Sequence, residues 1–245
     1  MERTYALKYH RLEGNHWWFL GRRDIIYKLI MDYHKDAEIL DIGCSGGALI
    51  GFLKAKGFKR LRGIDIDARA IDICRQKGIT DVRISDAAET EFKDRQFDII
   101  IASDMLEHIE NEDRALFEWY RILKPGGKLI VFVPAFKLLW SKHDEVNLHY
   151  RRYCKSDLIK VLRKNGFSIE RSSYWNFSLF FPTSFIRFSQ KLFSRGNKRS
   201  GDQLYEVPLF VNKTLEYILR LENIFLSGGI KFPLGVSLFA VARKV

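Results

Sequence analysis

A glycine-rich turn directly follows an apolar stretch, and these residues have the types and spacing of a cofactor site. Residues 39–42 read Ile-Leu-Asp-Ile and suit a strand buried on both faces, and residues 43–47 read Gly-Cys-Ser-Gly-Gly. Glycines let the backbone turn tightly, and the helix expected from Ala48 offers free N–H groups. A dinucleotide fingerprint has glycine at the positions of Ser45 and Ala48, so the turn predicts a nucleotide-type ligand but disfavours a dehydrogenase that binds NAD.

Two aspartates later in the chain fit other parts of such a ligand. Asp65 closes an expected strand, where its carboxylate can accept two hydrogen bonds from a ribose diol. Asp86 follows another short strand and can accept a hydrogen bond from the exocyclic amine of adenine. Each aspartate alone is equally consistent with a capped turn, because Asp favours turns. Their spacing together with the glycine turn predicts a ligand that contains adenosine.

Alternating strands and helices must position these residues. The hydrophobic pattern predicts strands at 37–44, 60–65, 82–85, 97–103, 128–134, 167–175 and 237–243. Helices are expected at 22–33, 48–56, 68–77, 112–123 and 156–165. Such alternation is typical of a parallel α/β sheet covered on both faces, whose ligands lie beyond the carboxyl ends of the strands. One edge of the sheet should therefore collect Gly43, Asp65, Asp86, Asp104 and Pro134.

The ordered set resembles the class I methyltransferases that use S-adenosylmethionine, from about Ile39 to Phe167. The similarity lies in residues 41–47, Asp65, Asp86, residues 97–104 and the Leu-Lys-Pro-Gly-Gly of residues 123–127. It implies a Rossmann-like sheet of seven strands, with the last strand antiparallel and inserted beside strand six. S-adenosylmethionine would be the cofactor and S-adenosylhomocysteine the product. By this resemblance the cofactor-binding residues are Asp41, Gly43, Cys44, Ser45, Gly46, Asp65, Ile66, Asp86, Ala87, Ser103 and Asp104.

Methyl transfer to oxygen also needs a group that removes the acceptor's proton. His108 follows strand four and titrates in the useful range, but it can equally shape the pocket. Certain family members that methylate catechol-like quinone precursors have acidic groups and a histidine at this spacing and bind a divalent metal. We expect no metal here, with Asp104, Glu107 and His108 as the alternative metal site.

A second polar cluster, residues 140–153, follows strand five and is expected to form the substrate wall. His143 or His149 could accept a hydroxyl proton, Asp144 could orient either ring, and an arginine could pair with an anionic acceptor. The predicted substrate residues are Trp140, Asp144, Arg151, Arg152 and Tyr153. The alternative is a salt-bridged loop packed on the helix that follows. The pattern is similar to that of bacterial methyltransferases of glycan and lipid-saccharide pathways.

The amino-terminal leader His16-Trp17-Trp18-Phe19 resembles the same bacterial group. It either closes the cofactor mouth or docks on the sheet as a plain lid. We expect one structural domain overall, with residues 1–36 as the aromatic lid and first helix and residues 37–245 as the methyltransferase domain.

About sixty residues separate strands six and seven, and an insertion of that length usually has a function. Residues 177–235 are expected to form two helices, the first broken near Pro182 and ended by Gly196, the second beginning after Asn212. Basic and aromatic residues are mixed in the segment that begins at Phe177 and ends at Arg199. This segment could contact an anionic membrane surface. The alternatives are a helical cap on the sheet and a dimer interface.

Composition restricts the remaining possibilities. The chain has 245 residues, 47% apolar, with a formal net charge of +11 and three cysteines without metal-binding spacing. No secretion signal or apolar stretch of eighteen residues is present, so we expect a cytoplasmic protein, monomeric or homodimeric, that can lie at the inner face of the membrane. The expected reaction is O-methylation of a saccharide, lipid-linked glycan or related small acceptor.

Other functions stay open from the sequence. They are a quinone-type or lipid-type O-methyltransferase, an RNA methyltransferase and a non-catalytic protein that binds S-adenosyl ligands. The net charge permits nucleic acid, but the basic residues are mixed with large apolar ones, so we do not expect nucleic acid as the partner.

Overall fold

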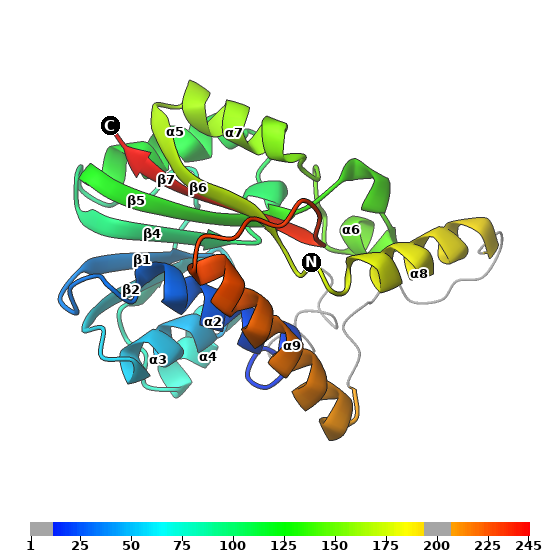
Figure 1. Ribbon diagram of the computed structural model, residues 1–245. Helices are drawn as coiled ribbons and strands as arrows, with labels where there is room; N and C mark the ends of the chain where they lie inside the picture. The colour runs from blue at the N-terminus through cyan, green and yellow to red at the C-terminus, as the bar shows by residue number, and fades with distance from the viewer. Residues whose placement is uncertain (1–11, 194–206) are drawn as a thin grey trace.

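A seven-stranded sheet forms the centre of the computed structural model, which describes residues 12–193 and 207–245 (Figure 1). The strand order is β3-β2-β1-β4-β5-β7-β6. The strands are β1 (Glu38–Ile42), β2 (Arg60–Asp65), β3 (Val82–Ile84), β4 (Phe97–Ser103), β5 (Leu123–Pro134), β6 (Phe167–Trp175) and β7 (Ser237–Lys244). β7 runs antiparallel to both β5 and β6 and lies between them. The expected α/β sheet with an inserted last strand is confirmed.

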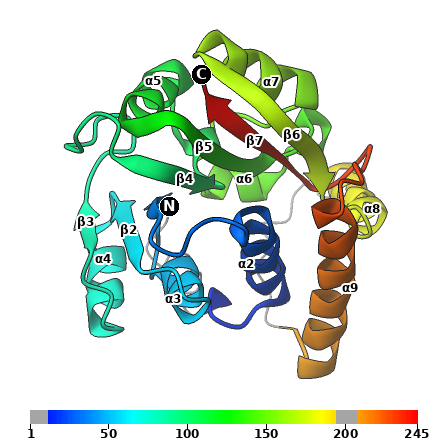
Figure 2. The ribbon, with the colours of Figure 1, turned by 60° about the vertical axis from the view of Figure 1, so that its left-hand side comes forward.

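Helices cover both faces of this sheet, as Figures 1 and 2 show. One face carries α2 (Trp17–Ile30), α3 (Ala48–Ala55), α4 (Ala68–Gln76) and α9 (Leu209–Ser227). The other face carries α5 (Glu112–Ile122) and α7 (Lys155–Lys164). Shorter elements follow β4 and β5, namely η1 (Leu106–His108), η2 (Lys137–Leu139) and α6 (Lys142–Val146), and α8 (Phe180–Phe193) follows β6. Among the described residues, no helix is long and apolar enough to span a membrane.

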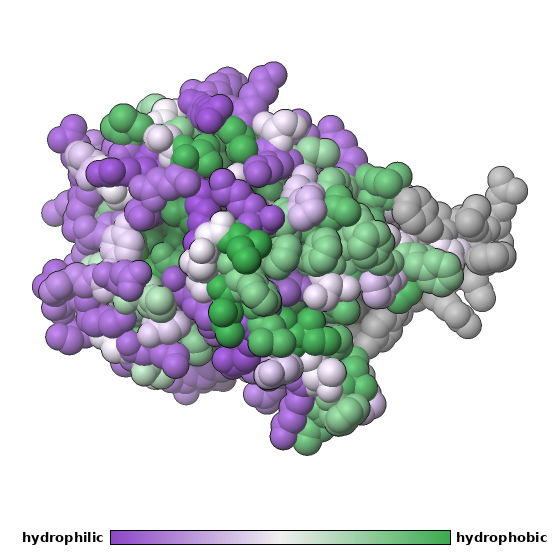
Figure 3. Space-filling view, in the orientation of Figure 1, coloured by the Kyte–Doolittle hydropathy of each residue, from purple (hydrophilic) through white to green (hydrophobic). Residues whose placement is uncertain are grey.

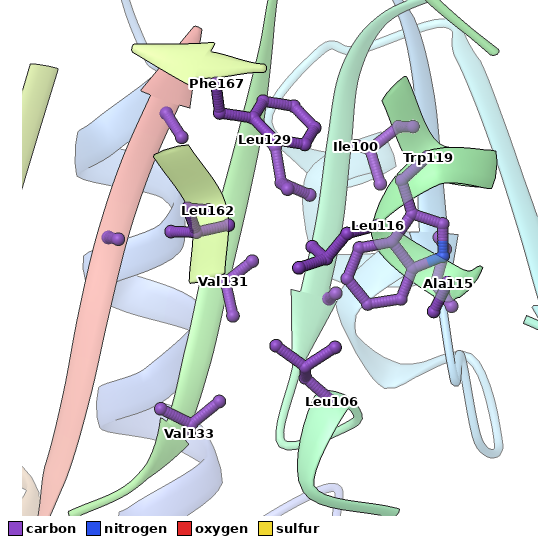
Figure 4. Packing of buried hydrophobic residues seen from close by; sticks show 14 of the residues in the cluster. Ile100, Leu106, Ala115, Leu116, Trp119, Leu129, Val131, Val133, Leu162 and Phe167 are labelled. Atoms are coloured by element: carbon purple, nitrogen blue, oxygen red, sulfur yellow. The ribbon is translucent and has the colours of Figure 1, made fainter. Parts of the chain in front are cut away.

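A hydrophobic core lies on each face of the sheet, and successive side chains of β5 belong alternately to one core and the other. Leu129, Val131 and Val133 face α5 and α7, where they pack with Leu116 and Trp119 (Figure 4). The intervening Ile130 and Phe132 belong to the opposite core, beneath α2 and α9. Because successive strand residues point to opposite faces, a continuous apolar strand is what a sheet covered twice requires.

Some expected helix ends were wrong. α2 begins at Trp17, five residues before the predicted start, because the His16 side chain accepts a hydrogen bond from the Trp18 N–H and caps the helix. Pro182 does not break α8, since it stands in the first turn, where proline's missing N–H costs no helical bond. α9 begins at Leu209 after Pro208, before the predicted Asn212. Gly196, the predicted end of α8, lies outside the described residues.

The strand order reverses between β1 and β4, since β1 pairs with β2 on one side and β4 on the other. A crevice at the carboxyl ends of the strands is expected at such a point. The loops after β1, β2, β4 and β5 therefore meet there, and they contain the residues selected from the sequence.

Candidate functional site

The glycine turn after β1 is held against β2 and leaves no room for a side chain. The N–H groups of Gly43 and Cys44 donate to the Ile64 carbonyl at 2.8 and 3.0 Å. Gly43 has a φ of +74°, which favours glycine, and a Cβ there would lie 2.7 Å from the Met105 Sδ. The absence of a side chain at Gly43 therefore lets Met105 pack directly against the turn.

Two adjoining cavities open at this turn. The larger has a volume of about 680 Å³ and the smaller about 240 Å³. Both are lined by Gly43, Asp65, Ile66, Met105 and His108, so one elongated ligand can occupy both. The smaller cavity also has Asp86 and Ala87 on its wall, as an adenine site would require.

Asp65 holds the rim of the cavities through its carboxylate. Its Oδ2 accepts the Ser45 N–H and its Oδ1 accepts the Asp67 N–H, each at 2.9 Å. Each carboxylate oxygen can accept a further hydrogen bond, so a ribose diol can bind the same group. The glycine turn at Gly43 and the carboxylate of Asp65 together fit S-adenosylmethionine.

Not every predicted cofactor residue lies on a cavity wall. Ser45, Ser103 and Asp104 line the larger cavity, whereas Asp41 of β1 and Cys44 of the turn are buried and line neither cavity. Burial, together with the negative charges of Glu13 and Asp65, raises the pKa of Asp41 well above its ordinary value. Asp41 is therefore a buried carboxyl group that does not line either cavity.

Glu13 is a functional candidate that the sequence did not reveal. Its carboxylate accepts hydrogen bonds from the Ser45 hydroxyl at 3.0 Å, the Gly46 N–H at 3.2 Å and the Ala48 N–H at 2.9 Å. It therefore binds the first turn of α3, whose N–H groups favour a negative charge. No local pattern could have found this contact, because Glu13 and Ala48 are 35 residues apart.

The aromatic leader forms one wall of the larger cavity, which contacts His16, Trp17, Trp18 and Phe19. Behind it, the Arg22 guanidinium lies 4.2 Å from the ring centroid of Trp175 and 3.4 Å from the Asp104 carboxylate. Although burial raises the pKa of Asp104, the charge of Arg22 opposes that rise. Arg22 thereby connects α2 with Asp104, the residue that directly follows β4.

The opposite wall is the polar cluster after β5. The buried Asp144 Oδ1 lies 2.9 Å from the His149 Nδ1 and accepts a hydrogen bond from the Arg152 Nε at 2.7 Å. Burial alone would raise the pKa of Asp144, but the hydrogen bond from His149 and the charge of Arg152 hold it well below its usual value. Asp144 therefore orients His149, and not His143, among the two predicted alternatives.

The predicted catalytic and substrate residues divide between the cavity and the surrounding loop. His108, His143, His149 and Arg152 line the larger cavity. Arg151 pairs with Glu112 at 3.1 Å, and the Tyr153 hydroxyl donates to the same carboxylate at 2.5 Å. Trp140 is half-buried at the end of η2. For Arg151 and Tyr153 the geometry thus matches the alternative of a salt-bridged loop.

The insertion after β6 adds residues to the cavity that were not selected from the sequence. Asn176, Thr183 and Arg187 line it, and the Arg187 Nη1 donates to the Leu139 carbonyl at 2.5 Å. Burial, aided by the positive charge of Arg152, lowers the pKa of Arg187 to about 9. The signal that could have identified Arg187 is a single arginine between Ile186 and Phe188 in an apolar helix.

Comparisons with known proteins show a methyltransferase domain in part of the chain. Residues 40–131 match the family model described as a methyltransferase domain. A probable S-adenosylmethionine-dependent methyltransferase of Mycolicibacterium smegmatis is 25% identical over 162 residues, which are 64% of this chain and 62% of that protein. The chain thus spans less than two thirds of this relative's length.

Solved structures share the fold over nearly the whole chain. The methyltransferase in complex with the Trm112 methyltransferase activator of Haloferax volcanii has a TM-score of 0.64 at 16% identity, covering 98% of this chain and 94% of that chain. Phosphoethanolamine N-methyltransferase 2 of Haemonchus contortus, solved with S-adenosyl-L-methionine, has a TM-score of 0.62 at 20% identity, covering 98% of this chain and 57% of that chain. Residues 40–131 thus match a methyltransferase domain, and the fold is that of S-adenosylmethionine-dependent methyltransferases.

Proposed function

We propose that the chain transfers a methyl group from S-adenosylmethionine to a hydroxyl oxygen of a saccharide, lipid-linked glycan or related small acceptor. The observation that carries this proposal is that the oriented His149 and the cofactor turn line the same cavity. S-adenosylmethionine, when bound, supplies a methyl group whose bond to sulfur breaks as the bond to the acceptor oxygen forms, leaving the electron pair on sulfur. The residues of the chain must align the acceptor and help it lose its proton.

His149 is the group placed to promote loss of that proton. Its Nδ1 is engaged by Asp144 at 2.9 Å, which fixes the ring and leaves Nε2 as the nitrogen for contacts in the cavity. Asp144 in turn accepts a hydrogen bond from Arg152, which holds the carboxylate in the position where it orients the His149 ring. His143 is a weaker candidate, because burial lowers its pKa to about 3.

The leader supports the proposal as a lid. Trp17 and Trp18 form a wall of the cavity, and the Trp17 N–H donates to the Asn212 side chain of α9 at 2.8 Å. Aromatic rings at this position would exclude water from the reacting groups. Residues 1–11, which we also assign to the lid from the sequence, lie outside the described residues.

The cavity chemistry favours an acceptor that carries negative charge beside its hydroxyl. Arg152 and Arg187 both line the cavity, from the loop after β5 and from α8. Guanidinium groups bind carboxylate and phosphate through paired hydrogen bonds. A lipid-linked saccharide with a phosphate linkage has both the hydroxyl and the charge.

Exposed apolar residues on α8 and α9 support delivery of such an acceptor from an anionic membrane surface. Phe185 is 75% exposed on α8 and Phe210 is 80% exposed on α9. Figure 3 shows hydrophobic residues gathered over the region of these two helices. Lys213 and Lys231 are exposed on or beside α9, and anionic lipid contributes roughly 1 kcal/mol for each nearby basic residue.

Liposome flotation tests the membrane contact. The full chain should float with vesicles containing phosphatidylserine, and less with neutral vesicles. Phe185→Ser and Phe210→Ser should reduce recovery in the floating fraction, whereas Phe117→Ser, on the exposed side of α5, should not. Recovery only in the soluble fraction with anionic vesicles would contradict the membrane contact without affecting the proposed reaction.

Turnover of S-adenosylmethionine by the full chain tests the reaction. S-adenosylhomocysteine should form with saccharide or polyprenyl-phosphate-saccharide acceptors, and His149→Ala should lower kcat by 10²-fold or more. His34→Ala, at a side chain that is 79% exposed and does not line either cavity, is the matched control and should keep full activity. Turnover with RNA or quinone precursors but not with saccharides would contradict the assigned acceptor. Tight S-adenosylhomocysteine binding without turnover on any acceptor would support a binding protein instead.

A further inference from the structure

Three side chains that can bind a metal converge in the larger cavity from two separate segments. Glu107 and His108 belong to η1 after β4, and His149 comes from the loop after α6. One potential ligand atom from each lies within 4.8 Å of the other two. The two imidazole rings are edge to face, with centroids 4.6 Å apart.

Each histidine has a neighbour besides the three proposed ligands. The His149 Nδ1 lies 2.9 Å from the buried Asp144 carboxylate. The His108 ring lies beside the backbone of Asn147. Histidines that bind metals almost always donate their other ring N–H to a carboxylate or a backbone carbonyl, because this fixes the tautomer and the ring orientation. The His149 ring meets this requirement.

Glu107 provides an independent observation. Its side chain is 1% exposed, and its Oε2 has no hydrogen-bond partner within the described residues. A buried carboxylate without a partner is costly, and a coordinated cation would remove that cost. Arg152 and Arg22 pair with Asp144 and Asp104 respectively, and not with Glu107.

We propose that Glu107, His108 and His149 bind one divalent cation on the wall of the larger cavity. Two imidazoles and one carboxylate favour Zn²⁺, Mn²⁺, Co²⁺ or Fe²⁺ over Mg²⁺, which prefers an all-oxygen site. The ligand set differs from the alternative site named from the sequence. Asp104 pairs with Arg22 and accepts a hydrogen bond from the Ser103 hydroxyl at 3.0 Å, so His149 takes its place.

The role of the cation rests on the proposed function, although its binding does not. A hydroxyl of the acceptor that coordinates the cation has a lowered pKa and loses its proton to water. His149 then promotes proton loss as a ligand of the cation and Asp144 fixes its orientation. Glu107, His108 and His149 all line the larger cavity, so a cation held by them would be within reach of an acceptor in that cavity.

Isothermal titration calorimetry with Zn²⁺, Mn²⁺ and Mg²⁺ tests the site directly, on chelator-treated full chain without a polyhistidine tag. One equivalent of Zn²⁺ should bind, with Mg²⁺ at least 100-fold weaker. Co²⁺ should give a visible absorption band from the coordinated ion. Neither readout depends on an acceptor, so failure of the proposed reaction would leave both results unchanged.

Variants separate this ligand set from its alternatives. Glu107→Gln, His108→Ala and His149→Ala should each weaken Zn²⁺ binding by at least tenfold, and Asp144→Asn should weaken it by 10- to 100-fold through the His149 ring. His143→Ala, whose ring centroid lies 6.1 Å from that of His149, should retain binding, as should Asp104→Asn. Circular dichroism must show that each variant is folded. If a variant is not folded, Co²⁺ absorption by the wild-type chain decides whether the cation site exists.

Two results would overturn the proposal. One is Zn²⁺ binding to the wild-type chain no tighter than millimolar, together with no Co²⁺ absorption band. The other is Zn²⁺ binding that survives in folded His149→Ala but is lost in folded Asp104→Asn.

Discussion

Replacement of Gly43 by alanine tests whether the cofactor turn needs a residue without a side chain. Gly43 and Gly78 have the same φ of +74°, so alanine has the same conformational penalty at both positions. The left-handed backbone costs alanine about 1–2 kcal/mol, partly offset by about 0.4–1 kcal/mol from a less flexible unfolded chain. Gly78→Ala is thus a matched control, and we expect it to lose about 1 kcal/mol.

The contact that distinguishes Gly43 is with Met105. A Cβ at Gly43 would lie 2.7 Å from the Met105 Sδ, whereas a Cβ at Gly78 meets no atom within 4 Å. Overpacking of this kind costs about 1–3 kcal/mol, so Gly43→Ala should lose about 2–4 kcal/mol in urea unfolding. Because Gly43 and Met105 line both cavities, Gly43→Ala should also weaken S-adenosylhomocysteine binding by at least tenfold.

A double variant shows whether Met105 causes the extra loss. Adding Met105→Ala to Gly43→Ala should recover part of the lost stability, because it removes the crowded sulfur. Equal stability losses in Gly43→Ala and Gly78→Ala, with unchanged ligand affinity in both, would refute the reasoning that close packing at this turn shapes the site.

Three further predictions concern the framework of the site. Asn223→Ala should destabilise the fold by about 2–4 kcal/mol in urea unfolding. The buried Asn223 side chain accepts the Trp175 Nε1–H at 2.9 Å, and its removal would leave several buried partners unpaired. Gly235→Ala should lower Tm by several degrees or more, because a Cβ would lie 2.4 Å from the Trp175 carbonyl oxygen; an unchanged Tm would contradict that packing. Burial tends to raise the pKa of Glu118, but hydrogen bonds from Arg121 and the segment around Thr90 lower it overall. Glu118 therefore adds stability above the unfolded pKa of about 4.3 that is lost as pH falls, so the deficit of Glu118→Gln in urea unfolding at pH 7 should shrink below about pH 4.

The sheet could be predicted because its signals are local. Residues 39–42 and 97–103 are continuous apolar stretches, which parallel strands buried on both faces require. The Pro-Gly-Gly of residues 125–127 correctly indicated that a helix ends just before it, since α5 ends at Ile122. The strand begins earlier than predicted, however, because β5 starts at Leu123 and includes these residues, with Gly126 at a φ of +76°. Only the family resemblance, and not the pattern, indicated that β7 would lie between β5 and β6.

The site was only partly predictable because its contacts join distant segments. Asp65 and Asp86 could be placed from strand ends, since the fold brings those ends to one edge. The sequence left His143 and His149 as equal partners of Asp144, because a spacing of one or five residues does not determine which ring points inward. Glu13 and Arg187 were missed because their partners lie 32 to 35 and 48 residues away along the chain.

Calorimetric titration of S-adenosylhomocysteine into the wild-type chain, Asp65→Asn and Asp72→Asn tests the assignment of the cavities as the cofactor site. Asp65 is placed for the ribose diol, and hydrogen bonds to a charged group contribute about 1.5–3 kcal/mol, which corresponds to roughly a 10- to 150-fold change in Kd. Asp72 is exposed on α4 and serves as the control. We predict binding to the wild-type chain and Asp72→Asn and weaker binding by that factor to Asp65→Asn. No binding to the folded wild-type chain, or equal affinity in Asp65→Asn, would contradict the assignment.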